Sequence, residues 1–91
     1  MIRKHFVFYG AVQGVGFRYR ARHAANITGC TGWVRNDWNG TVTMELQGAE
    51  ELIDAVITAI ERGPFIHIEN MESRVIPVDE EERWFRTEYD G

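Results

Sequence analysis

Hydrophobic and polar residues alternate most regularly in the middle of the chain, over residues 41–47. The apolar positions there are Val42, Met44 and Leu46. A period of two predicts a β-strand with one face in the core. A strand-like segment, residues 31–36, precedes it, and the Asn39-Gly40 pair between the two tolerates the positive φ angles of a tight turn. These two segments therefore predict a β-hairpin.

Two other segments have apolar residues at helical spacing. The first runs from Phe17 to about Thr28, and Gly29 is placed to end it. Its apolar or small face consists of Phe17, Ala21, Ala24, Ala25 and Thr28. The second begins at Glu50-Glu51, where acids suit the helix dipole, and ends near residues 62–64. Its apolar face consists of Leu52, Ile53, Val56, Ile57 and Ile60. Each helix is thus expected to turn one face toward the core.

Three further segments, residues 5–9, 65–76 and 84–89, are rich in β-branched or aromatic residues and predict strands. Residues 77–82 are acidic and predict an exposed, solvated turn. The order β-α-β-β-α-β with a short final strand is typical of the ferredoxin-like, split β-α-β fold of the α+β class, with two helices on one face of a mainly antiparallel sheet. At 91 residues, without a linker or a repeat, we expect a single domain, residues 1–91.

The first predicted strand leads into a glycine-rich stretch, Gly10-Ala11-Val12-Gln13-Gly14-Val15-Gly16-Phe17-Arg18. Glycines let the backbone turn tightly and bring its N–H groups close to a ligand. A loop that ends at a helix N-terminus is a natural site for an anion. Arg18 adds a positive charge whose planar fork suits a phosphate. We interpret the loop as a phosphate cradle with Arg18 as its anchor.

Asn36, at the end of the second predicted strand, is the other candidate site residue. Its side-chain amide donates and accepts hydrogen bonds, so it can orient a water molecule without supplying a proton. The sequence around these two residues supplies no obvious general base, activated nucleophile or cluster of metal ligands. Binding a phosphoryl group and placing a water beside it suffices only for a substrate that is already activated, such as a mixed carboxylic-phosphoric anhydride.

The formal net charge of -4 disfavours the binding of nucleic acid or of an anionic membrane. Residues 1–45 carry a charge of +4 and residues 46–91 a charge of -8. The glycine loop lies in the basic half, and this placement fits a small anionic ligand. The single cysteine, Cys30, excludes an intrachain disulfide. Because no signal peptide opens the chain and no apolar stretch is long enough to span a bilayer, we expect a cytoplasmic protein. We also expect the protein to use no cofactor.

The glycine stretch, followed by Gly32-Trp33-Val34-Arg35-Asn36 and Gly40-Thr41-Val42, resembles the two signature blocks of the acylphosphatase family, in order and at the usual separation. The resemblance implies a metal-free hydrolase that converts an acyl phosphate and water to a carboxylate and inorganic phosphate. By position, Arg18 corresponds to the phosphate-binding arginine and Asn36 to the residue that orients the attacking water. The cradle corresponds to the backbone amides of Gln13, Gly14, Val15, Gly16 and Phe17. In the family, the substrate's own phosphate is taken to accept the proton of the water, which agrees with the missing base.

Two positions depart from what is common in that family. Ala21 stands where relatives commonly have a threonine that supports the loop, so the loop has one brace fewer. Trp38 is large for a turn residue. If its side chain lies at the mouth of the site, it would favour substrates with aromatic acyl groups.

The sequence is also compatible with two other functions. One is a catalytically weak or accessory acylphosphatase-like domain, of the kind found at the N-terminus of the carbamoyl transferases of hydrogenase maturation. The other is an RNA-binding module, because RNA-recognition domains share the fold, although their glycine-aromatic signature is not reproduced here. The length of 91 residues favours a free-standing protein, and we expect a monomer whose partner is a small acyl phosphate.

Overall fold

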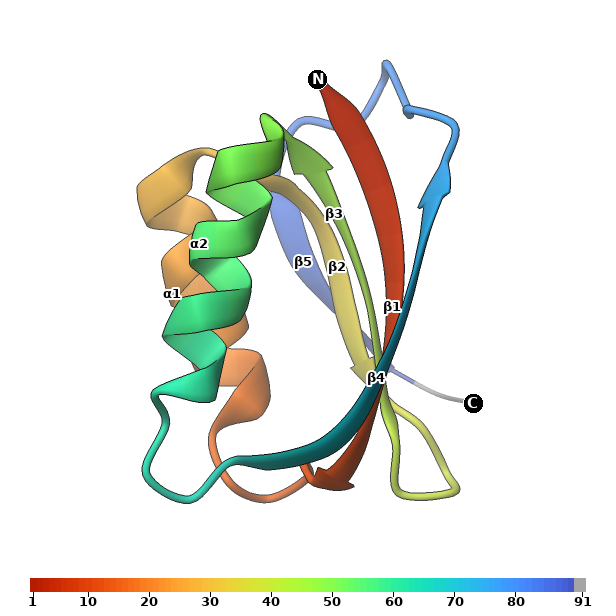
Figure 1. Ribbon diagram of the computed structural model, residues 1–91. Helices are drawn as coiled ribbons and strands as arrows, with labels where there is room; N and C mark the ends of the chain where they lie inside the picture. Colours follow the sequence, from red (N-terminus) through yellow and green to blue (C-terminus); the bar gives the residue numbers. More distant parts are fainter. Residues whose placement is uncertain (90–91) are drawn as a thin grey trace.

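The computed structural model describes residues 1–89, which form a sheet with two helices packed on one of its faces (Figure 1). The elements are β1 (Ile2–Ala11), α1 (Phe17–Thr28), β2 (Thr31–Asn36), β3 (Val42–Gly48), α2 (Glu50–Glu61), β4 (His67–Ile76) and β5 (Phe85–Tyr89). The sheet order is β4-β1-β3-β2-β5, and every neighbouring pair is antiparallel except β2 and β5. The predicted ferredoxin-like split β-α-β fold with a short final strand is confirmed.

The element bounds agree with the predictions most closely in the first helix and the second strand. Both have the predicted ends, and Gly29 closes α1 with a left-handed φ of 79°. The largest difference is β1, which was expected over residues 5–9 and extends from Ile2 to Ala11. Because β1 lies between β3 and β4, hydrogen bonds along both of its edges extend the strand beyond its apolar run. The last two strands begin one or two residues later than predicted, at His67 and Phe85.

The core lies between the sheet and the helices. The alternating residues Val42, Met44 and Leu46 of β3 are completely buried there, as predicted. The buried helix residues are Phe17, Ala21, Ala24 and Ala25 of α1 and Ile53, Val56, Ile57 and Ile60 of α2. Leu52 departs from the prediction, because 38% of its surface is exposed at the edge of the apolar face. Neither helix in residues 1–89 is long and apolar enough to cross a membrane.

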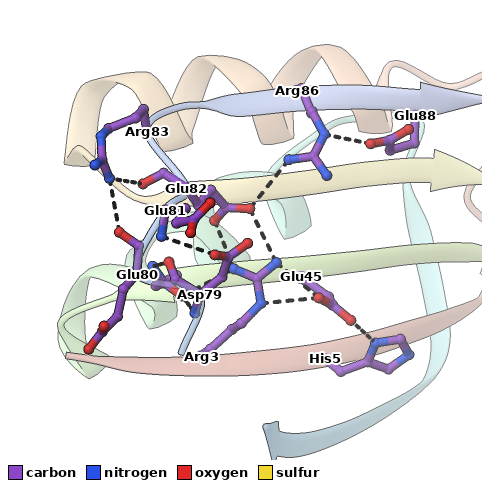
Figure 2. A network of polar contacts seen from close by, with 11 residues as sticks. Arg3, His5, Glu45, Asp79, Glu80, Glu81, Glu82, Arg83, Arg86 and Glu88 are labelled. Atoms are coloured by element: carbon purple, nitrogen blue, oxygen red, sulfur yellow. Dashed lines mark hydrogen bonds and ion pairs between the residues drawn. The ribbon is translucent and has the colours of Figure 1, made fainter. Parts of the chain in front are cut away.

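A polar network covers part of the other face of the sheet (Figure 2). Arg3 on β1 is at its centre and pairs with Glu45 at 2.9 Å and with Glu82 at 2.8 Å. His5 Nδ1 lies 2.6 Å from the second oxygen of Glu45. Gln47 holds the loop before β5, because it accepts a hydrogen bond from Asp79 N and donates one to Asp79 O.

The prediction of an exposed, solvated turn over residues 77–82 is therefore wrong for Glu82. Its side chain is only 3% exposed, because the loop folds back over the sheet and brings the carboxylate to Arg3. Burial works to raise the pKa of Glu45, but the hydrogen bonds from His5 and Arg3 outweigh it, and the pKa lies below its usual value. The charges of this network are thus compensated by one another.

Candidate active site

The glycine-rich loop connects the end of β1 at Ala11 with the start of α1 at Phe17. Gly14 and Gly16 have φ angles of 71° and 85°, in the left-handed region that other residues seldom adopt. A Cβ atom on either would meet nothing within 4 Å, so the backbone conformation and not the available space requires glycine here. The two turns carry the chain directly from the sheet into the first turn of α1.

The N-terminus of α1 presents unpaired backbone donors. The first hydrogen bond of the helix runs from Arg20 N to Gly16 O, so the N–H groups of Phe17, Arg18 and Tyr19 have no acceptor within the helix. Gly16 has no side chain that could cap them, and the first turn has no acidic residue. This helix end is therefore suited to an anion, both by its donors and by its dipole.

These elements meet at a small cavity of about 170 Å³. Its lining consists of Val12, Gly14, Gly16, Phe17, Arg18, Tyr19 and Asn36. The structure thus places Arg18 and Asn36 around one cavity, although 18 positions separate them in the chain. Of the residues expected to form the cradle, Gly14, Gly16 and Phe17 line the cavity, whereas Gln13 and Val15 do not.

Asn36 is the last residue of β2 and is paired with Val42 of β3 and Tyr89 of β5. Its Oδ1 is buried and has no hydrogen-bond partner among the residues that the structure describes. A buried acceptor without a partner is costly, so such atoms are rare in folded proteins. Because Asn36 lines the cavity, a hydrogen-bond donor bound there that reached this oxygen would satisfy it.

Arg18 is half-buried, and its Cζ lies 5.9 Å from the centre of the Tyr89 ring. Within residues 1–89 no carboxylate forms an ion pair with it. Its charge is therefore available to an anion in the cavity.

Gln13 has a role that the sequence did not indicate. Its side-chain Nε2 donates hydrogen bonds to Asp37 O at 2.6 Å and to Thr41 O at 2.9 Å. These carbonyls belong to the turn of the β2–β3 hairpin, immediately after Asn36. Gln13 therefore ties the glycine loop to the hairpin and fixes the two halves of the site to each other.

Asp37 organises that turn and was likewise missed as a site-supporting residue. Its carboxylate accepts hydrogen bonds from Thr41 Oγ1 at 2.8 Å, Thr43 Oγ1 at 2.6 Å and Arg35 Nε at 3.0 Å. Burial works to raise the pKa of Asp37, but these hydrogen bonds from Thr43, Thr41 and Arg35 lower it further than burial raises it. The available signal was an aspartate opening an Asn-Gly turn, since Asp side chains often bond to nearby turn residues.

Trp38 does not line the cavity, and 90% of its surface is exposed in the hairpin turn. Ala21 is completely buried in the core beneath the site. No group of three or more His, Cys, Asp or Glu side chains in residues 1–89 is arranged to hold a metal ion. The polar groups that the cavity lining offers to a ligand thus include the backbone N–H groups at the start of α1, the guanidinium of Arg18 and the amide of Asn36, beside the apolar side chains of Val12 and Phe17.

A family model described as Acylphosphatase matches residues 4–87. The acylphosphatase of Geobacillus thermodenitrificans is 41% identical over 100% of this chain and 98% of its own length. The acylphosphatase of Oceanobacillus iheyensis is 40% identical over 88% of this chain and 90% of its own.

Solved structures agree with these sequence matches. The crystal structure of acylphosphatase from Bacillus subtilis superimposes with a TM-score of 0.88 at 29% identity, covering 98% of this chain and 100% of that one. Full-length HypF in its phosphate- and nucleotide-bound form matches with a TM-score of 0.81 at 30% identity, covering all of this chain but only 13% of that one. The same domain therefore occurs both as nearly a whole chain and as a small part of a long one.

Proposed function

The chain belongs to the acylphosphatase family and is an enzyme of that class, and from this premise we propose how its residues hydrolyse an acyl phosphate. Arg18 and the backbone amides of the loop residues that line the cavity, Gly14, Gly16 and Phe17, hold the phosphoryl group. Asn36 orients the water that attacks it, and the reaction needs no metal ion. The observation that carries the proposal is that Arg18, Asn36 and the N-terminus of α1 all line one small cavity.

The phosphoryl group is held by charge and by backbone donors. The phosphoryl oxygens carry negative charge, and the cavity offers the uncapped N–H groups at the start of α1 together with an arginine that no described carboxylate neutralises. These donors are fixed before the substrate arrives, because the glycine turns and Gln13 hold the loop. Preorganised donors stabilise the charge of the transition state without having to reorganise.

In the chemical step, the oxygen of the water forms a bond to phosphorus while the bond between phosphorus and the acyl oxygen breaks. The leaving group is a carboxylate, which needs no proton to depart. The proton of the water passes to an oxygen of the substrate's own phosphate, so no protein group has to act as a base. Asn36 Oδ1 contributes by accepting a hydrogen bond from the water, since it is buried and lacks another partner in residues 1–89.

An accessory role is the second candidate, because HypF contains this fold as 13% of its chain. An accessory domain would fold and bind phosphate but would not turn substrate over. The two candidates are therefore separated by turnover and not by binding.

The test is the hydrolysis of benzoyl phosphate in excess chelator by the wild type and by Arg18→Gln. We expect the wild type to be active and Arg18→Gln to lose about 10³-fold or more in kcat/KM, as for other residues that stabilise transition-state charge, with an unchanged circular dichroism spectrum. Inorganic phosphate should inhibit competitively, because the product fits the same cavity. A folded but inactive wild type would favour the accessory role, and unchanged kinetics of Arg18→Gln would overturn the assignment of Arg18.

A further inference from the structure

A second hollow of about 180 Å³ adjoins the phosphate cavity. Its lining consists of Arg18, Tyr19, Arg22, Thr87 and Tyr89. Arg18 and Tyr19 also line the phosphate cavity, so the two spaces share a wall. We call the second space the acyl hollow.

The acyl hollow has two arginines on one side. Arg18 and Arg22 are four residues apart on α1, so their side chains leave the same side of the helix. Like charges at this spacing repel each other, and no carboxylate in residues 1–89 forms an ion pair with either arginine. Arg20 differs, because its Nη1 donates a hydrogen bond to Ala59 O at 2.9 Å and so links α1 to α2. Arg22 thus carries a charge with no structural use in the part of the chain that is described.

The remaining walls are aromatic or bear a hydroxyl group. Tyr19 and Tyr89 are 66% and 78% exposed, and Thr87 of β5 carries a hydroxyl group. Rings offer flat apolar surface, while guanidinium groups pair with carboxylates or phosphates. The hollow therefore suits a short or flat organic group that ends in an anion.

We propose that the acyl hollow binds the acyl part of the substrate and that Arg22 recognises a second anionic group on it. The preferred substrate class is then an acyl phosphate whose acyl group itself carries a carboxylate or a phosphate. This inference rests on the proposed function, because it requires a phosphoryl group held beside Arg18, which lines both spaces. Arg22 acts here as a specificity-determining residue and takes no part in the bond changes.

The test compares the binding of two stable phosphonates, benzylphosphonate and 4-carboxybenzylphosphonate, which differ by one carboxylate. Calorimetry gives their Kd values for the wild type, Arg22→Gln and Arg22→Lys. Arg83→Gln is the matched control, since Arg83 is an exposed arginine in the loop before β5 and hydrogen-bonds to the carbonyls of Glu80 and Glu82 (Figure 2). Turnover of benzoyl phosphate is measured separately on the same samples.

We expect the carboxylate to tighten binding to the wild type about three- to tenfold, as a partly exposed ion pair with arginine would. Arg22→Gln should abolish this preference, Arg22→Lys should keep part of it, and Arg83→Gln should keep all of it. Added salt should reduce the preference, because the pair is accessible to screening. Equal binding of the two phosphonates by the wild type, or a preference that survives in Arg22→Gln, would overturn the proposal. A wild type that fails to hydrolyse benzoyl phosphate would overturn the proposed function instead, since the binding comparison does not depend on turnover.

Discussion

Arg3 and Arg18 occupy opposite electrostatic surroundings in the same small protein. Arg3 is 5% exposed and is bonded to two carboxylates and to the amide of Gln47. Arg18 is half-buried at a cavity and has no carboxylate partner within residues 1–89. A charge whose partners are all supplied by the fold contributes to folding, whereas a charge that the fold leaves uncompensated is available to a ligand. The partners of an arginine thus indicate its role better than its burial does.

Loss of Arg3 should have the largest effect on stability and almost none on catalysis. In Arg3→Met the carboxylates of Glu45 and Glu82 lose their main partner, which should lower the free energy of unfolding by about 3–5 kcal/mol. Urea unfolding measures this, and kcat/KM for benzoyl phosphate should stay within about twofold, a change of about 0.4 kcal/mol in the barrier.

The double variant Arg3→Met/Glu82→Gln should recover part of the loss, because it removes one of the charges left without a partner. If the double variant is as unstable as Arg3→Met alone, the uncompensated carboxylate is not the cause. If Arg3→Met loses its activity while folded, the division between the two arginines fails.

Asn36→Ala should give the converse result. We expect kcat to fall by about 10²–10³-fold with KM nearly unchanged, because the interaction of Asn36 with the water matters in the transition state. The free energy of unfolding should change by less than about 1 kcal/mol, since Oδ1 has no partner among the described residues to lose. Steady-state kinetics and urea unfolding together check this, and a large rise in KM would assign Asn36 to substrate binding instead.

Two glutamines offer a smaller and more closely matched contrast. Gln13 bonds to the hairpin beside the cavity, and Gln47 bonds to Asp79 in the network around Arg3. Each variant to alanine should lose about 1–2 kcal/mol of unfolding free energy, because backbone groups lose their partners. Only Gln13→Ala should also lose activity, by about tenfold in kcat/KM, because the loop and Asn36 are no longer fixed to each other.

The same measurements on both variants decide the point. Equal activity of Gln13→Ala and Gln47→Ala would show that the tie between the loop and the hairpin has no effect on catalysis.

The smallest expected effect is on the pH dependence of stability. The pKa values of Glu45 and Asp37 are lowered in the folded protein from ordinary values of 4.5 and 3.8. Each group therefore adds stability that is fully present above its ordinary pKa and is lost as the pH falls through the lowered one. Urea unfolding at a series of pH values should show the free energy of unfolding decreasing below about pH 4.5, and Glu45→Gln should make that decrease shallower. An equal decrease in Glu45→Gln would assign it to other groups.

The features that the sequence predicted well are those that depend on neighbouring residues. The ends of α1 follow from the glycine loop and Gly29, and the buried face of β3 follows from its alternation. The burial of Glu82 could not be predicted, because it depends on Arg3, which lies 79 positions away in the chain. The side-chain bonds of Gln13 cross 24 and 28 positions and were missed for the same reason. Arg18 and Asn36 could be proposed as partners from their motifs, but only the strand order shows that they line one cavity.

The position of β1 between β3 and β4 also has a consequence for the order of folding. The glycine loop and Arg18 leave the ribosome early, yet β1 is paired with β3 and with β4, and β4 ends only at Ile76. A nascent chain that has reached α2 therefore still has one open edge on β1, which exposes it to wrong pairing with other chains. Closing that edge joins segments far apart in sequence, a feature that slows folding relative to local helical packing. The strand that leads into the glycine loop is thus synthesised first but gains its second neighbour only after most of the chain has been made.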